Sequence, residues 1–348
     1  MKIFRSPFGK HPDGTEAVLI KIENPDGSFI EVTNWGAKLV SLVVPDRDGK
    51  LDDVVLGYAS FNDYFKGHRF YGSNVGRFAN RIKNGRFPIG NKVFQLSINR
   101  DDFHQHGGFK GFDSVFWDFE IKDDAVVFSR ISPDGEEGYP GTLNAAITYC
   151  FRTDHQLEIY YHATTDRPTH LNIAHHSYFN LSGADYGQIG HHKVSINASQ
   201  FLEVDQNHIP TGQMLRVDET PLDLRKPQSI LDGIDADHPV IQHARGFDQC
   251  FVLDKPADTM DYCALVSDPL SGRKMDVLST LPALQFYTGN FCESIVPGKK
   301  GKMYGLRSAF CLEPQFYPNS PNIREFPNTL LKPGEEWHHK VIYRFSTE

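Results

Sequence analysis

The chain has 348 residues, 39% of them hydrophobic and 23% charged, a balance typical of a globular protein with a sizeable core. Its formal net charge is −8 and no stripe of Lys and Arg runs along it, which argues against nucleic acid or an anionic membrane as partner. An N-terminus without an apolar leader, no run near the ~20 apolar residues of a membrane span, and five scattered cysteines predict a cytoplasmic protein.

Short segments of alternating apolar and polar residues predict strands. The first two cover residues 18–23 and 29–33, and Pro25-Asp26-Gly27 forms a turn between them. Further strands are expected at residues 39–44, 148–151, 156–162 and 337–345, with turns at 45–49, 133–135 and 319–322. Helical signals are confined to residues 60–65 and 229–231. Many short strands without a linker predict an all-β fold, a large sandwich or barrel.

Sixteen histidines, several of them clustered, raise the question of a metal site. His104 and His106 would point to the same face of a strand and could share an ion. The carboxylate that such a pair needs does not follow, and Lys110 stands nearby. The glycines at 107, 108 and 111 lack the helix that a phosphate cradle requires. We expect neither a metal nor a cofactor.

Glu313 lies in a rigid, apolar stretch that would bury it in part. A buried structural carboxylate is one interpretation, and acid–base chemistry with a histidine is the other. A His and a Glu have unperturbed pKa values near ~6.5 and ~4.3, so one is protonated while the other is ionised close to neutral pH. Opening a sugar ring requires such a pair, because the C1 hydroxyl loses a proton while the ring oxygen gains one.

Seven sequence blocks, in the same order, resemble those of the galactose mutarotase (aldose 1-epimerase) family. They include Gly76-Arg77-Phe78-Ala79-Asn80-Arg81-Ile82 and His176-Ser177-Tyr178-Phe179-Asn180-Leu181. The blocks cover residues 76–82, 105–117, 132–141, 176–181, 246–248, 285–290 and 312–322. The resemblance implies one domain over residues 1–348 with the large antiparallel β-sandwich of the galactose mutarotase-like type.

The resemblance also implies roles for particular residues. Glu313 matches the base that takes the C1 hydroxyl proton, and His176 matches the acid that protonates the ring oxygen. His106 matches a second histidine that holds the sugar near C1. The residues that match sugar-binding positions, or that neighbour them, are Arg81, Asn80, Asp248 and, as an apolar wall, Phe286.

Two residues depart from the family pattern. His175 stands where the family usually has Asn, and Gln249 stands where many members have His. Strand alternation predicts that His175 points into the sandwich, away from His176. Arg77 is interpreted as structural, and Cys250 and Cys311 as small core residues.

The implied function is the interconversion of the α and β anomers of free hexoses such as galactose and glucose, with a monosaccharide as the partner. A hexose-6-phosphate 1-epimerase would need a basic cluster near C6, and no such cluster joins the motifs. A non-catalytic sugar-binding protein of the same fold is the third alternative, and it is disfavoured because Glu313 and both histidines are present. Whether the chain is a monomer or a homodimer stays open.

Overall fold

The computed structural model describes residues 1–67, 70–293 and 295–348. Its sheets are antiparallel throughout, as the alternating patterns favour. Helices are short in the described ranges: α1 (Asp63–Lys66), α2 (Ile230–Ile234) and α3 (Pro239–Ala244), with 3-10 turns at Phe112–Ser114, Glu136–Gly138 and Ser320–Asn322. None of these helices has the length and apolar character needed to cross a membrane.

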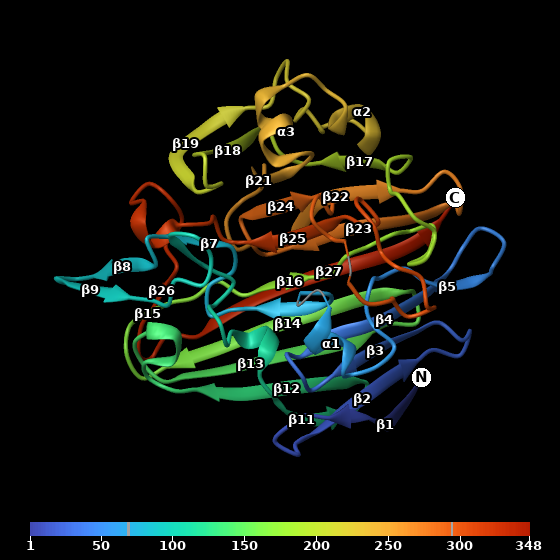
Figure 1. The fold of residues 1–348 in the computed structure, drawn as a ribbon, viewed down its shortest axis with the longest axis horizontal. Helices are drawn as coiled ribbons and strands as arrows, with labels where there is room; N and C mark the ends of the chain where they lie inside the picture. The colour runs from blue at the N-terminus through green and yellow to red at the C-terminus, as the bar shows by residue number, and fades with distance from the viewer. Residues whose placement is uncertain (68–69, 294) are drawn as a thin grey trace.

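A nine-stranded sheet forms one layer of the molecule (Figure 1). In spatial order its strands are β11 (Asp118–Lys122), β12 (Ala125–Ser132), β13 (Leu143–Phe151), β14 (Gln156–Thr165), β27 (Trp337–Thr347), β23 (Arg273–Ser279), β22 (Asp261–Ser267), β17 (Lys193–Ile196) and β20 (Gln228–Ser229). The C-terminal strand β27 therefore lies in the middle of the sheet, between β14 and β23.

Two five-stranded sheets and a short strand pair between them form the second layer. One sheet holds β1 (Lys2–Lys10), β2 (Glu16–Glu23), β3 (Phe29–Thr33), β4 (Lys38–Pro45) and β5 (Leu51–Asp53). The other holds, in spatial order, β19 (Pro210–Arg216), β18 (Gln200–Val204), β21 (Asp248–Val252), β24 (Ala283–Tyr287) and β25 (Cys311–Gln315). The pair β6 (Ser73–Val75) and β16 (Ala174–His176) contacts β4 on one side and β25 on the other.

Three further strand pairs extend from the sandwich. They are β7 (Arg81–Lys83) with β10 (Phe103–Gln105), β8 (Arg86–Ile89) with β9 (Lys92–Gln95), and β15 (Thr169–His170) with β26 (Leu330–Leu331). The β8–β9 hairpin projects from one end of the molecule (Figure 1).

The core lies between the two layers. Its largest apolar cluster takes residues from all three large sheets, for example Ile30, Ile147 and Leu284. Along β13, alternate residues face this cluster while the residues between them are more exposed, which is the pattern of a sheet with one buried face. The expected all-β sandwich is confirmed.

The strands predicted from alternation are all present. Residues 29–33 match β3 in both bounds, and the other five expected strands lie within longer observed ones. The expected helix at 60–65 is shorter, because Asn62 is the N-cap of α1 and Ser60 instead donates to Asp63 Oδ2 at 2.7 Å. The α3 helix was not predicted.

Among the described residues, some buried polar side chains have no hydrogen-bond partner, and Gln249 is one of them. Gln249 on β21 is 1% exposed, and neither its Oε1 nor its Nε2 forms a hydrogen bond with any described residue. It stands opposite Phe286 of β24, on the face that packs into the apolar core. An unsatisfied buried amide costs about 1–3 kcal/mol.

We therefore expect Gln249→Met to raise the free energy of unfolding by about 1–3 kcal/mol, because methionine fills a similar volume without a polar group. Urea unfolding followed by circular dichroism measures the change. The matched control is Gln285→Met on the neighbouring strand: Gln285 donates to Asp248 Oδ1 at 2.6 Å, so its loss should destabilise. A destabilised Gln249→Met variant would contradict this account.

Candidate active site

A cavity of about 460 Å³ opens at the second layer, where β7, β16, β21, β24 and β25 meet. It brings together six of the seven site residues predicted from the sequence: Asn80, Arg81, His106, His176, Asp248 and Glu313. These residues are up to 233 positions apart in the chain, from Asn80 to Glu313, and only the fold brings them into contact.

Glu313 forms the floor of the cavity. It is the central residue of β25 and is 3% exposed. Pairing with β24 places it opposite Gln285, while its neighbour Leu312 stands opposite Phe286 on the core face. The alternation of the strand therefore directs the carboxylate away from the apolar core and into the cavity.

His176 lies at the end of β16, beside β25. Its Nε2 is 3.7 Å from Glu313 Oε1, and the imidazole is 6% exposed. The rings of Phe70 and Tyr178 stack on the imidazole, with centroid distances of 5.8 and 4.9 Å and interplanar angles of 9°. This stacking fixes the plane of the ring, so that one imidazole edge is held toward the carboxylate.

His106 lies just past the end of β10, in a left-handed conformation with φ of 50°. Its Nδ1 accepts a hydrogen bond from the backbone N–H of Asn80 at 3.2 Å. The proton of a neutral imidazole is therefore on Nε2, which makes this atom a donor. The His106 ring lies 5.4 Å from the His176 ring, centroid to centroid.

The turn after His106 requires glycine. Gly107 has φ of +85°, and a Cβ on it would lie 1.7 Å from the carbonyl oxygen of Gly76. The next turn is held by Glu137, whose carboxylate accepts from the N–H groups of Phe109 and Lys110 at 3.0 and 2.9 Å. The sequence block at residues 132–141 thus supports the turn after His106 without lining the cavity itself.

Arg81, Asp248 and Gln285 form a hydrogen-bonding cluster on the wall of the cavity. Arg81 Nη2 donates to Asp248 Oδ2 at 3.3 Å, and Gln285 Nε2 donates to Asp248 Oδ1. Arg81 Nη1 also donates to Asn80 Oδ1 at 3.3 Å. Such a row of fixed donors and acceptors suits the vicinal hydroxyls of a small polyol.

Burial decides the charge behaviour of Glu313. Desolvation raises the pKa of its carboxyl well above the ordinary range, and the nearby Asp248 carboxylate raises it further, while Arg81 lowers it. A carboxylate with a raised pKa is a stronger base once it is ionised. Glu313 therefore differs from a structural carboxylate, whose pKa an ion-pair partner lowers.

The expectation for Phe286 needs correction. Phe286 is fully buried in the apolar core, where its ring packs 4.9 Å from that of Phe247, and it does not line the cavity. Residues of a strand alternate in direction, so Gln285 and Tyr287 face the cavity and Phe286 between them cannot. The sequence did not show that Gln285, and not Phe286, stands opposite Glu313 in the pairing of β24 with β25.

Several cavity residues were not predicted. Aromatic walls come from Phe70, Tyr178, Tyr287 and Phe291, and His208 enters from the loop between β18 and β19. His208 accepts from Arg81 Nη1 through its carbonyl and stacks on His243 with a centroid distance of 4.2 Å. Tyr178 and Tyr287 lie inside recognised blocks and could have been found there, whereas nothing in the sequence marked His208.

His175 points into the sandwich, as strand alternation predicts. It is fully buried, and its Nε2 shares a 2.7 Å hydrogen bond with Ser177 Oγ. Burial lowers the pKa of His175 to about 3, so the ring stays neutral at physiological pH. His175 therefore adds no charge next to His176.

Arg77 is structural. Its guanidinium is 2% exposed and donates to the carbonyls of Ser132, Pro133, Pro140 and Gly141 at 2.8–3.1 Å, and to Ser132 Oγ. The blocks at residues 76–82 and 132–141 therefore hold each other in place.

Three groups of side chains in the described ranges have metal-ligand character: His162 with Glu336 and His338, His176 with Cys311 and Glu313, and His191 with His192 and Asp268. In the last group both ring nitrogens of His192 are engaged, by the Leu181 N–H and the Ile189 carbonyl. His104 is not part of any of these groups. Its Nδ1 contacts the Ser97 carbonyl and its Nε2 the Tyr139 hydroxyl, both at 2.7 Å.

The chain thus forms a large β-sandwich with a cavity of about 460 Å³ that is lined by polar and titratable side chains. A sequence profile of the family described as aldose 1-epimerase matches residues 18–344. Galactose mutarotase of Rattus norvegicus is 41% identical over 346 residues, 99% of each chain, and aldose 1-epimerase of Escherichia coli (strain K12) is 34% identical over 340 residues, 97% of each. A solved galactose 1-epimerase from Lactobacillus acidophilus superposes with a TM-score of 0.87 at 29% identity, covering 99% of each chain. The chain belongs to the aldose 1-epimerase family.

Proposed function

We propose that the chain is an aldose 1-epimerase that interconverts the α and β anomers of free hexoses such as galactose and glucose, with Glu313 as base and His176 as acid. The observation that supports these roles is the 3.7 Å separation of His176 Nε2 from Glu313 Oε1 at the floor of a cavity of monosaccharide size. The family relationship supports the reaction itself.

The reaction needs two proton transfers across the C1–O5 unit of the sugar. Glu313 takes the proton of the C1 hydroxyl while His176 gives a proton to the ring oxygen, and the C1–O5 bond breaks to give the open-chain aldehyde. Rotation about C1–C2 presents the other carbonyl face. Ring closure then returns both protons, so no net charge or atom is gained.

The other residues position the sugar. His106 donates from Nε2 to an oxygen near C1, because its Nδ1 is occupied by the Asn80 N–H. Arg81 and Asp248 bind hydroxyl groups, and Asn80 stands beside Arg81. Phe70 and Tyr178 keep the His176 ring in plane.

A free hexose suits the cavity better than a hexose 6-phosphate. The described lining residues include two arginines, Arg81 and Arg100, against three carboxylates, those of Asp101, Asp248 and Glu313. This lining holds no excess of positive charge that would bind a phosphate dianion. We further propose a cytoplasmic location, since all five cysteines are free and buried.

Polarimetry tests the function. Freshly dissolved α-D-galactose and α-D-glucose are expected to reach rotational equilibrium faster with the protein, and α-D-glucose 6-phosphate is expected to be accelerated far less. A phosphosugar preference would contradict the assignment to free hexoses, and an unchanged rate with every sugar would favour a binding protein.

A further inference from the structure

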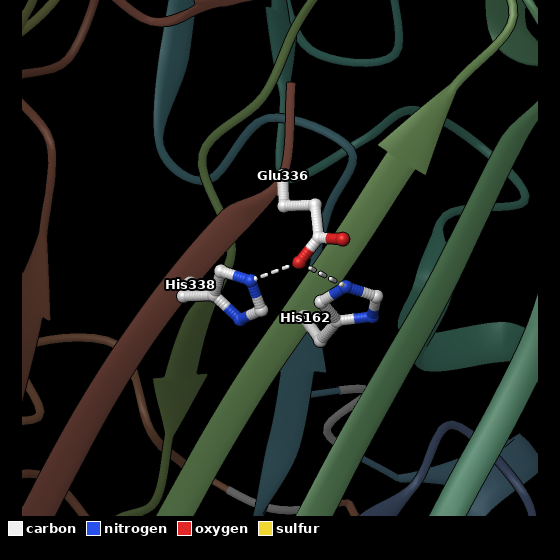
Figure 2. Close-up of side chains that lie close together, drawn as sticks. All are labelled: His162, Glu336 and His338. Carbon is white, nitrogen blue, oxygen red and sulfur yellow. Dashed lines mark hydrogen bonds and ion pairs between the residues drawn. The ribbon is translucent and has the colours of Figure 1, made fainter. Parts of the chain in front are cut away.

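A second cluster of chemistry-bearing side chains lies on the opposite layer, outside the cavity. His162 on β14 and His338 on β27 are directly paired across these two neighbouring strands, so both rings stand on the same face of the nine-stranded sheet. Glu336 precedes β27 by one residue and is two positions before His338. Figure 2 shows the Glu336 carboxylate between the two imidazoles.

The ligand atoms converge on one point. Glu336 Oε2 lies 2.6 Å from His338 Nε2 and 3.6 Å from His162 Nε2, and the three ligand atoms are all within 4.8 Å of one another. The two rings are 4.6 Å apart, centroid to centroid. Ligand atoms of a tetrahedral zinc site are about 3.3 Å apart, as bonds of about 2.0–2.1 Å require. The separations of Glu336 Oε2 from the two ring nitrogens, 2.6 and 3.6 Å, lie on either side of this value.

The surroundings leave room for an ion. The side chains of His162, Glu336 and His338 are 44%, 61% and 59% exposed, so the ion would keep water on its outer side. His162 stands opposite Ala146 on β13, a residue too small to fill the space beside the ring. Trp337 and His339 point into the core instead, since strand residues alternate.

The charge at the cluster is also suited to a cation. The nearest lysine along β27, Lys340, is held away by Glu158, whose Oε1 it contacts at 2.8 Å. One carboxylate oxygen and two imidazole nitrogens form a donor set that suits zinc and copper.

We propose that His162, Glu336 and His338 bind a divalent transition-metal ion of the zinc–copper class at the outer face of the nine-stranded sheet. Each imidazole would coordinate through Nε2, with its proton on Nδ1, and Glu336 would supply one oxygen. Water would complete the coordination shell. The bound ion would link β14 to the C-terminal strand β27 and add to the stability of that pair.

Isothermal titration of the untagged protein with zinc sulfate tests the proposal. We expect one Zn²⁺ per chain at this site. Each of His162→Gln, Glu336→Gln and His338→Gln should bind zinc at least tenfold more weakly, because even the loss of a residue that only supports a metal ligand weakens binding by about that factor. The matched control is His155→Gln. His155 Nε2 is 2.7 Å from Asp26 Oδ2, so this pair has one imidazole and one carboxylate but no second imidazole. His155→Gln should bind zinc as the unchanged protein does.

A spectroscopic readout identifies the ligands. The electron paramagnetic resonance spectrum of the protein with one equivalent of Cu²⁺ should show coupling to two imidazole nitrogens, and the double variant His162→Gln/His338→Gln should lose that signal. Sugar anomerisation should be unchanged in the double variant. If the double variant binds zinc with unchanged affinity, or if one equivalent of zinc inhibits anomerisation equally in both proteins, the ion sits elsewhere, for example at His176, Cys311 and Glu313, and the proposal is wrong.

Discussion

Glu313→Gln is expected to lower kcat for anomerisation by about 10²–10⁴-fold, the contribution of one positioned acid–base group. The amide keeps the size of the carboxylate but cannot take the C1 hydroxyl proton. Because Glu313 is almost fully buried and its charged form is disfavoured by desolvation, the neutral amide should not destabilise the fold. Polarimetry at several sugar concentrations separates the loss in kcat from any change in KM.

The control for this substitution is Glu336→Gln, the same chemical change at an exposed glutamate on the other layer. It should leave kcat unchanged. A Glu313→Gln variant with near-normal kcat would show that another group takes the proton.

The pH dependence provides an independent check of the same residue. Glu313 accepts a proton only when ionised, and burial raises its pKa above the ordinary value of a glutamate. In a plot of kcat/KM against pH, which reports ionisations of the free enzyme, the rate should therefore rise with pH. This rising limb should lie at a pH above the usual range of carboxylate pKa values. This limb should vanish in Glu313→Gln.

Unfolding by acid is expected to begin well above the pH at which ordinary carboxylates titrate. Burial lowers the pKa of His208 and, further, of five more deeply buried histidines: to about 3 for His175 and to about 4 for His104, His170, His192 and His339. The hydrogen bonds of these rings also favour their neutral form. In His192, for example, one ring nitrogen accepts from the Leu181 N–H at 3.1 Å, so a proton on that atom would break the bond.

The sign follows from proton uptake. Below the unfolded pKa of about 6.5 the unfolded chain binds a proton at each of these histidines and the folded chain does not, so stability falls as the pH falls from 6.5 toward 4. Glu313 acts in the opposite direction, because its raised pKa lets the folded state take up a proton first. A net uptake of about four protons corresponds to a slope of about 5 kcal/mol per pH unit. Since proteins of this kind have a total stability of about 5–15 kcal/mol, the fold should be lost between about pH 5.5 and about pH 3.5.

Urea unfolding between pH 8 and 5 measures this slope, and the range above pH ~7 serves as the internal reference because both states hold these histidines neutral there. His192→Gln should reduce the slope by about 1.4 kcal/mol per pH unit, the value for one proton. A stability that stays level from pH ~7 to ~5 would contradict the argument.

Local pattern and spacing were sufficient for much of this protein. The alternation of apolar and polar residues at 29–33 predicted a strand with the bounds that the structure has. This was possible because a strand repeats every two residues, a pattern that can be read from which residues are apolar. The blocks of residues shared with a known family identified Glu313, His176, His106, Arg81, Asn80 and Asp248, which the structure gathers at one cavity.

Only the tertiary structure decided which way each side chain points and what it meets. Phe286 was expected at the cavity and lies in the core, since the direction of a strand residue depends on the register with its neighbours. His162 and His338 are 176 positions apart, and no local pattern could bring them opposite each other before β14 and β27 paired. The sequence by itself determined the chemistry that the chain carries, whereas long-range strand pairing determined where that chemistry converges.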